Sequence, residues 1–313
     1  MGSIIHKISN IINRPTWSYY TLVKMIARRH PLWVSDKLYE KAQIYLSVGR
    51  KLNLNNPHTF NEKLQWLKLY YRRPEYSIMV DKYAVKKYVA DIVGEEYIIP
   101  TFGVWNRTED VDWNSLPEKF VLKCTHDSGG LIICHDKEKL DKNAALARLN
   151  ECLKRDFYIL EREWPYKNVP RRIIAEKLLE DETRSNDDLT DYKFYCFNGK
   201  PTYCQVINDR SSHETIDFFD MEWQHQEFVG LNPNARNAEV SPPKPKQFEE
   251  MKKIAQLLAG NIPFSRIDLY NVSNLVYFGE ITLYPASGQG RFDPEEYNSI
   301  LGNLIQLPQP YKK

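Results

Sequence analysis

The sequence predicts an α+β protein whose strands pair mainly in antiparallel fashion. Helical periodicity dominates residues 1 to 74, whereas hairpin signals and shorter helices occupy the rest of the chain. This order differs from the regular strand–helix–strand alternation of a doubly wound parallel sheet. Neither a Walker A sequence nor a glycine-rich dinucleotide-binding motif is present. A chain of 313 residues suits one multi-lobed unit or a few small subdomains around a cleft.

Residues 1–75 are predicted to form an N-terminal helical region. Isoleucines recur at helical spacing near its start, and basic side chains accompany them: Ile4, Ile5, Ile8, Ile11 and Ile12, with Lys7, Arg14, Lys24, Arg28 and Arg29. Such a helix can lie on a membrane surface, or it can dock on its own domain or on a partner. Docking is the commoner case, and the spacing leaves both hypotheses open.

Three further helices are expected before the first strand. Apolar residues at intervals of three and four predict helices over Leu38–Val48, Phe60–Tyr71 and Asp81–Val93. Thr59 and Glu62 have the spacing of a capping box for the second of these helices. Gly94 is a suitable C-cap for the third.

The remaining segments alternate strands with helices. The predicted strands are Tyr97–Val104, Phe120–Cys124, Leu131–Cys134, Arg172–Leu179, Tyr192–Phe197, Thr202–Ile207, Phe264–Tyr270 and Leu275–Leu283. Helices are predicted over residues 141–160 and 247–260, and a proline-rich connector over Pro233–Pro245. The clearest hairpin signal is Asn198-Gly199, which separates two apolar runs.

The composition is that of an ordinary globular protein. Hydrophobic residues make up 42% and charged residues 27%, and the net charge of +2 gives no reason to expect nucleic-acid binding. The aromatic content of 13% can line a groove for sugars, although packing explains most aromatic residues. Neither a signal peptide nor an apolar run of about 18 residues is evident.

The five cysteines predict neither a disulfide framework nor a zinc site. Their number is odd and no two of them form a Cys-x-x-Cys pair. This pattern suits the reducing cytoplasm.

The last predicted hairpin carries two carboxylates that interrupt strongly apolar strands. Asp268 and Glu280 lie near each other on one face if the strands pair through the short loop between them. Two bare carboxylates on an apolar sheet require a compensating cation, and Mg²⁺ is a natural candidate. The alternative places both on the solvent face of an edge hairpin, paired with Arg266 or a lysine.

Three weaker patterns precede that hairpin. Lys123 ends a strand just before the loop Thr125–Gly130, where it can point at phosphates that backbone N–H groups cradle. Glu176-Lys177 lies within an apolar run, a pattern that is more often an edge strand, and Asp191-Tyr192-Lys193 precedes the Asn-Gly hairpin. Each pattern is ambiguous in isolation.

Together these patterns resemble the ATP-grasp arrangement, and more narrowly the family named after the teichuronopeptide-biosynthesis protein TupA. The resemblance covers residues 40 to 300 approximately and rests on four segments: residues 56–67 (NPHTFNEKLQWL), 120–130 (FVLKCTHDSGG), 191–201 (DYKFYCFNGKP) and 278–288 (FGEITLYPASG). It implies an ATP-grasp fold, in which two mainly antiparallel α+β lobes clasp ATP and Mg²⁺. The lobes are expected over residues 76–313, with 76–115 preceding the nucleotide site, 116–178 as the first lobe and 179–313 as the second.

The resemblance also implies roles for individual residues. Lys82, Lys123 and Lys193 would contact the phosphates, and the loop containing His126, Ser128, Gly129 and Gly130 would cover them. Glu176, Lys177 and Leu178 would meet the adenine edge, with a carboxylate near Asp181 on the ribose. Asp268 and Glu280 would hold Mg²⁺, while Arg266 would stabilise developing negative charge. Thr282 stands where many ATP-grasp ligases have an asparagine ligand, and its hydroxyl would ligate the metal weakly or through water.

The reaction implied by the family is ATP-dependent amide formation through an acylphosphate. The expected substrates are an amino acid and a uronic-acid carboxyl group of a bacterial surface polysaccharide (capsule, O-antigen or teichuronopeptide). If that glycan is carried on a lipid, the N-terminal helix has a reason to contact the inner membrane face. A sugar kinase would use the same nucleotide site. The polysaccharide context and the aromatic content suggest a glycosyltransferase as a further alternative, but Asp220-Met221-Glu222 is too weak a match to its acidic motif to support it. A catalytically silent scaffold would have no use for the charged set.

Overall fold

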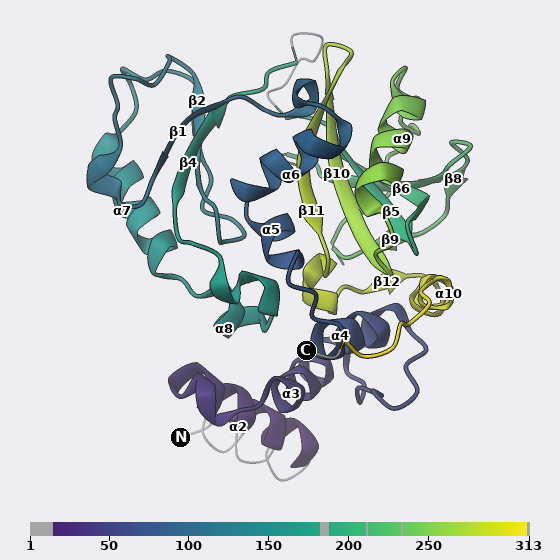
Figure 1. Ribbon diagram of the computed structural model, residues 1–313. Coiled ribbons are helices and arrows are strands. Elements are labelled where there is room, and N and C mark those ends of the chain that lie inside the picture. Colours follow the sequence, from purple (N-terminus) through teal and green to yellow (C-terminus); the bar gives the residue numbers. More distant parts are fainter. Residues whose placement is uncertain (1–14, 182–187, 211, 233, 312–313) are drawn as a thin grey trace.

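The computed structural model describes residues 15–181, 188–210, 212–232 and 234–311. Figure 1 shows two sheets that face each other across a central gap, with helices α5 (Tyr76–Val80) and α6 (Ala84–Val93) between them. The N-terminal helices lie together at one end of the molecule. All strand pairings between the named strands are antiparallel. The predicted α+β class is therefore confirmed.

The N-terminal region contains α2 (Pro15–Arg29), the 3-10 turn η1 (Pro31–Trp33), α3 (Asp36–Val48) and α4 (Phe60–Tyr70). Ser35 caps α3 by accepting from the Leu38 N–H, and left-handed Gly49 ends it. The predicted capping box of α4 is present, because Thr59 and Glu62 satisfy each other's backbone N–H groups.

The first sheet has the strand order β1-β4-β2-β3 and is covered on one face by α7 (Lys142–Lys154). Its strands are β1 (Thr101–Trp105), β2 (Phe120–Cys124), β3 (Ile132–Cys134) and β4 (Ile173–Lys177). Alternation along β2 places Phe120, Leu122 and Cys124 in the core beneath α7. Val121 and Lys123 therefore face the gap between the sheets.

The second sheet has the order β11-β10-β5-β6-β7-β8 and packs against α9 (Phe248–Ala259). Its strands are β5 (Asp191–Phe197), β6 (Lys200–Asn208), β7 (Thr215–Asp220), β8 (His225–Gln226), β10 (Phe264–Val272) and β11 (Leu275–Thr282). The Asn198-Gly199 turn has left-handed backbone at both residues, as the hairpin signal requires. The opposite face of this sheet, carrying Asp191, Lys193, Arg266 and Asp268, lines the gap.

Short elements complete the fold. The 3-10 turns are η2 (Glu95–Tyr97), η3 (Thr108–Asp110), η4 (Trp164–Asn168) and η5 (Pro285–Gly288). The others are α8 (Phe157–Glu161), α10 (Tyr297–Leu304) and a small pair, β9 (Val229–Gly230) with β12 (Phe292–Asp293).

Several sequence predictions were wrong in detail. The helix expected over Asp81–Val93 begins only at Ala84, so Lys82 lies in the turn after α5. The strand expected from Tyr97 starts at Thr101, after the turn η2. The helix expected over 141–160 breaks at Arg155, whose extended backbone separates α7 from α8. Strand β4 is interior to its sheet, which contradicts the edge-strand alternative for Glu176-Lys177.

The predicted helix with Ile4, Ile5, Ile8, Ile11 and Ile12 lies outside the described residues. Among the residues that are described, no helix combines the length and apolar character needed to cross a bilayer. The five cysteines are buried free thiols.

Phe60 joins α4 to the second sheet. Its ring is fully buried and packs edge-on against Phe264 at 4.9 Å and Phe292 at 5.6 Å between ring centroids. The large core under the second sheet thereby includes the N-terminal helix α4.

We expect Phe60→Ala to lower the free energy of unfolding by about 3 to 5 kcal/mol, because it opens a cavity between α4 and the sheet. Urea unfolding followed by circular dichroism measures this change. Phe102→Ala is the control, since Phe102 is 37% exposed and its loss should cost about 1 kcal/mol or less. Equal losses in the two variants would contradict the role given to Phe60.

Candidate active site

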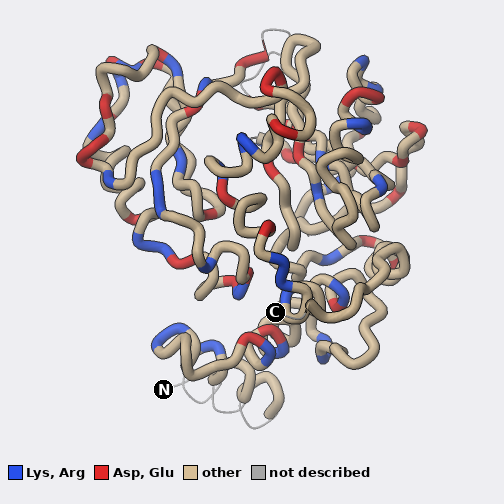
Figure 2. The backbone as a smooth tube through the Cα atoms, viewed as in Figure 1, with Lys and Arg blue, Asp and Glu red and all other residues tan. Residues whose placement is uncertain are grey.

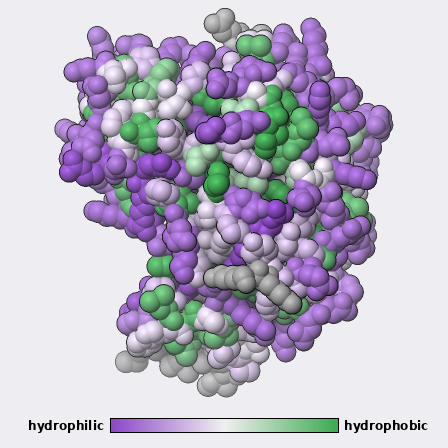
Figure 3. All heavy atoms as spheres, in the orientation of Figure 1, coloured by the Kyte–Doolittle hydropathy of each residue, from purple (hydrophilic) through white to green (hydrophobic). Residues whose placement is uncertain are grey.

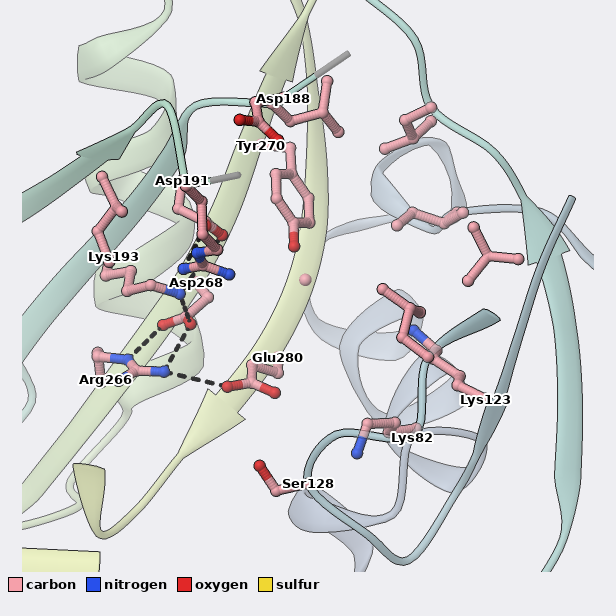
Figure 4. A pocket seen from close by; sticks show the side chains of 18 of the residues that line it. Lys82, Lys123, Ser128, Asp188, Asp191, Lys193, Arg266, Asp268, Tyr270 and Glu280 are labelled. Atoms are coloured by element: carbon pink, nitrogen blue, oxygen red, sulfur yellow. Dashed lines mark hydrogen bonds and ion pairs between the residues drawn. The ribbon is translucent and has the colours of Figure 1, made fainter. Parts of the chain in front are cut away.

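A cleft of 630 Å³ lies between the two sheets. Its polar lining comes from both sides, and Figure 4 shows Lys82, Lys123 and Ser128 facing Lys193, Arg266, Asp268 and Glu280 across it. Its apolar lining includes Ile99, Val121, Leu131, Ile133, Leu178, Leu179, Leu189, Ile207, Ile216 and Leu231. The cleft thus has an apolar part and a strongly charged part.

Three charged residues form a row across the second sheet. Lys193 on β5 is the register partner of Asp268 on β10, and Asp268 is the partner of Glu280 on β11. Lys193 Nζ lies 2.5 Å from Asp268 Oδ2. Side chains directly opposite each other in neighbouring strands share one face, so antiparallel pairing alone brings these three groups together.

Arg266 ties the two carboxylates of this row together. Its guanidinium makes a bidentate contact with Asp268, at 2.7 Å to each oxygen, and reaches Glu280 Oε1 at 3.0 Å. The Thr282 hydroxyl donates to the same Glu280 oxygen at 2.8 Å. Asp268 is buried, which contradicts the solvent-face alternative, whereas the Glu280 side chain is 47% exposed towards the cleft.

The charges of this row determine the ionisation of Glu280. Burial alone would raise its pKa, but Arg266, Lys193 and Lys82 lower the pKa to about 2. Burial lowers the pKa of Lys82 on the opposite side, and Lys123 adds to that effect while Glu280 opposes it. Glu280 therefore stays anionic at neutral pH and faces cations from both lobes.

In the first sheet, one buried carboxylate holds two lysines. Glu176 is 4% exposed and pairs with Lys123, and its other oxygen lies 2.6 Å from Lys86 Nζ. Burial would raise the Glu176 pKa, but the two lysines lower it below its ordinary value. Lys86 also donates to the Ile99 carbonyl at 2.5 Å.

The loop Thr125–Gly130 is anchored to its surroundings. The Lys82 N–H donates to the Thr125 carbonyl at 3.1 Å, and the Lys82 ammonium donates to the Asp127 carbonyl. His126 is buried, and burial with the nearby Arg171 lowers its pKa. Only Ser128 of this loop lines the cleft.

The sequence-predicted site residues divide into two groups. Those that line the cleft are Lys82, Lys123, Ser128, Glu176, Lys177, Leu178, Lys193, Arg266, Asp268 and Glu280. His126, Gly129, Gly130, Asp181 and Thr282 do not line it, although Thr282 contacts Glu280.

Four charged residues that line the cleft were not predicted as site residues: Asp188, Asp191, Arg210 and Glu214. Asp191 is buried, and its oxygens lie 3.4 Å from Lys193 Nζ and 2.6 Å from Arg210 Nη2. Its position two residues before Lys193 on one strand was a usable signal, because residues i and i+2 share a face. Arg210 lies in the loop after β6, where no periodicity could have marked it.

The loop that follows the acidic row is held by helix α4. Asn61 Nδ2 donates to the carbonyls of Gly288 and Gly290, both at 2.9 Å, and Gln65 Nε2 donates to that of Ser287 at 2.8 Å. Ala286, which lines the cleft, and Ser287 both have left-handed backbone. Such strain in residues other than glycine persists only where neighbouring groups enforce it.

Lys68 and Glu163 hold the same loop through hydrogen bonds with Ser287. Lys68 is fully buried, donates to the Ser287 carbonyl at 3.0 Å and lies 3.0 Å from Glu40 Oε1. The Ser287 hydroxyl donates to Glu163 at 2.6 Å. A side chain at Gly288 would approach Gln65 Nε2 to 2.7 Å, so glycine is required there.

The donor chemistry of the acidic row fits Mg²⁺ as part of a larger coordination shell. Mg²⁺ prefers hard oxygen ligands and commonly takes one or two carboxylates together with phosphate oxygens and water. Asp268 and Glu280 are carboxylates of this kind, and both Asp268 oxygens are already bound by Arg266. Within the described residues, no group of three or more His, Cys, Asp or Glu side chains could hold a metal ion.

Two antiparallel α+β lobes enclose a cleft in which Lys82 and Lys123 face Asp268 and Glu280, an arrangement typical of ATP-grasp proteins. The sequence matches the family described as TupA-like ATPgrasp over residues 62–306. The chain therefore belongs to the TupA-like ATP-grasp family. No curated protein matches it.

Solved structures with weaker likeness include ATP-grasp ligases. D-alanine–D-alanine ligase from Bacillus anthracis, complexed with ATP, has 16% identity and a TM-score of 0.37 over 72% of this chain and 56% of that one. The Helicobacter pylori enzyme has 16% identity and a TM-score of 0.42 over 81% and 68%. The ATP-grasp ligase PsnB, complexed with minimal precursor, Mg and ADP, has 12% identity and a TM-score of 0.36 over 71% and 57%. The chain spans just over half the length of the first and third of these, and the family assignment rests on the sequence match.

Glu163 should make the stability of the protein depend on pH. Burial raises its pKa to about 7, against the opposing effect of Lys68, so between pH 4.5 and 7 the folded state keeps a proton that the unfolded state releases. The free energy of unfolding then falls as pH rises through this range, by roughly 3 kcal/mol at most. We expect Glu163→Gln to remove this decline, as measured by urea unfolding at pH 5 and pH 8.

Glu295→Gln is the control, because Glu295 belongs to an exposed ion pair with Arg50. It should leave the difference between the two pH values unchanged. If Glu163→Gln retains the full wild-type difference, Glu163 does not carry it.

Proposed function

We propose that this protein is an ATP- and Mg²⁺-dependent carboxylate–amine ligase that acts through an acylphosphate. Its proposed substrates are an amino acid and a uronic-acid carboxyl group of a bacterial surface polysaccharide such as capsule, O-antigen or teichuronopeptide. The observation that carries the proposal is the charged row Lys193–Asp268–Glu280, which Arg266 joins and Lys82 and Lys123 face. Membership of the ATP-grasp family supports the use of ATP.

The cleft has the two parts that a nucleotide requires. Its apolar wall suits a flat base, and the segment Lys177–Leu179 lies at that wall, next to the position proposed for the adenine edge. The ammonium groups of Lys82, Lys123 and Lys193 suit the triphosphate, because phosphate binding is mainly charge neutralisation. Asp191 and Asp188 line the cleft beside Tyr270 and are better placed for the ribose than Asp181, which does not line it.

Asp268 and Glu280 would hold Mg²⁺, which supplies neutralisation of phosphate charge when it is bound. The chain's own residues position the reactants. The uronic-acid carboxylate oxygen attacks the γ-phosphorus and ADP leaves. The neutral amine then attacks the acyl carbon, the nitrogen loses one proton to solvent, and phosphate leaves as the amide forms. Arg266 contributes a fixed guanidinium next to the developing negative charge. These steps need positioning and charge neutralisation, and no nucleophilic side chain.

The acidic triplet Asp220-Met221-Glu222 gives no support to the glycosyltransferase alternative. Asp220 Oδ1 accepts from the backbone N–H groups of Glu222 and Gln224, so the Asp220-Met221-Glu222 segment forms the turn after β7. None of these residues lines the cleft.

We expect ATP with Mg²⁺ to raise the melting temperature of the wild-type protein, since a ligand at about 100 times its Kd adds about 2.7 kcal/mol. Lys123→Met and Asp268→Asn should each weaken nucleotide binding by about tenfold or more in calorimetric titration. Lys87→Met and Asp91→Asn are the matched controls, because those residues form an exposed pair on α6. The absence of stabilisation by ATP with Mg²⁺ would rule out both the ligase and a sugar kinase.

Product analysis separates these two enzymes. We expect incubation with ATP, Mg²⁺, uronic-acid glycans and an amino-acid mixture to give ADP, free phosphate and an amide adduct in mass spectra. Added hydroxylamine should trap the acylphosphate as a hydroxamate. ADP with a phosphorylated sugar and no free phosphate would identify a kinase.

A further inference from the structure

The exposed face of the N-terminal helical region carries apolar side chains that no described residue covers. Leu22 and Met25 on α2 are 54% and 56% exposed, and Leu32 and Trp33 on the turn η1 are 90% and 76% exposed. Leu22, Met25 and Arg29 follow one another at intervals of three and four, so they share one side of the helix. Leu22, Met25, Leu32 and Trp33 are named the α2–η1 face below.

This face is held rigidly by the rest of the protein. Val23 and Ala27, on the other side of α2, are buried against α3 with Tyr39 and Ala42. Arg162, itself buried, donates to the Pro31 carbonyl at 2.8 Å and thereby fixes η1 to the segment after α8. The Trp33 ring stacks on His30, with 4.1 Å between ring centroids. The apolar side chains therefore project from a helix and a turn that are packed against the rest of the protein.

The segment that carries the face has charge of one sign. Residues 1–35 contain five Lys and Arg and no Asp or Glu, so Asp36 is the first acidic residue of the chain. Figure 2 shows α2 with basic residues only. Arg28 and Arg29 are exposed, and within the described part of the chain neither has a carboxylate partner. In Figure 3 this end of the molecule shows apolar side chains beside polar ones.

We propose that the α2–η1 face docks on an anionic membrane surface. Trp and Leu side chains on a rigid turn suit the interfacial layer of a bilayer, and the surrounding arginines suit anionic headgroups. A second copy of the chain fits poorly, because a twofold interface through this face would bring like charges together. Residues 1–14 fit poorly as a cover, since their charged residues Lys7 and Arg14 add to the positive charge.

Docking by this face is independent of the proposed chemistry, because none of its residues lines the cleft. It would hold the enzyme where lipid-linked molecules are found. The surface needs no membrane-spanning segment, only apolar side chains that reach the interface and charges that attract it.

Vesicle flotation of the full-length protein tests the proposal. We expect binding to vesicles of phosphatidylcholine with 30% phosphatidylglycerol, and at least tenfold weaker binding to phosphatidylcholine alone or in high salt. The double variant Leu32→Ser/Trp33→Ser should reduce partitioning at least tenfold. Arg28→Gln/Arg29→Gln should reduce it roughly tenfold and weaken its dependence on salt.

Matched controls separate the face from general effects of exposure and charge. Val240→Ser/Leu275→Ser changes two side chains that are 84% and 59% exposed elsewhere, and Lys87→Gln/Arg107→Gln removes two exposed charges. Both controls should float like the wild type. The proposal is overturned if the wild type does not float, if the controls lose as much binding as the face variants, or if Leu32→Ser/Trp33→Ser abolishes a dimer in sedimentation velocity while flotation is unchanged. Equal melting temperatures for all variants confirm that each is folded.

Discussion

The buried ammonium of Lys68 connects the three parts of this protein. It lies 3.0 Å from Glu40 of α3, donates to the Glu161 carbonyl at the end of α8, and donates to the Ser287 carbonyl after β11. Removing an ion from water costs several kcal/mol, so a fully buried lysine is retained only where its partners are firmly placed. Its three contacts fix the N-terminal helices, the first lobe and the loop beside the acidic row relative to one another. The cleft depends on that fixed relation.

The contacts of α4 explain how the motif of residues 56–67 acts together with the motif of residues 278–288. Asn61, Gln65 and Lys68 lie on the buried side of α4 and bind carbonyls of residues 287–290. That loop adopts left-handed backbone at Ala286 and Ser287 directly after the strand that bears Glu280. Helix α4 therefore shapes this part of the cleft, although it lies more than 200 residues away in sequence. Its role is positioning, since none of the three side chains lines the cleft.

The sequence predicted those features that depend on local pattern. Asp268 and Glu280, which interrupt apolar strands, were predicted to share a face and are register partners, and the Asn-Gly signal identified the second hairpin. Contacts between segments that are distant in sequence could not be predicted. No local pattern near Ser287 points to its contact with Gln65, and none near Glu176 points to its contact with Lys86. The short strands β8, β9 and β12 are too brief to show periodicity. Arg210 was missed for a similar reason, because a residue in a loop does not belong to any periodic hydrophobic pattern.

Both lobes pair a buried carboxylate with two cations, and this arrangement lets one cation leave. Glu176 is held by Lys86, which lies outside the cleft lining, and by Lys123, which lines it. Asp268 is held by the bidentate Arg266 and by Lys193. If Lys123 or Lys193 turns towards a phosphate, the carboxylate it leaves keeps a partner and avoids the cost of an unpaired buried charge. The second cation of each pair would then make the first available for the proposed phosphate ligand, and Lys86 would serve this purpose without lining the cleft.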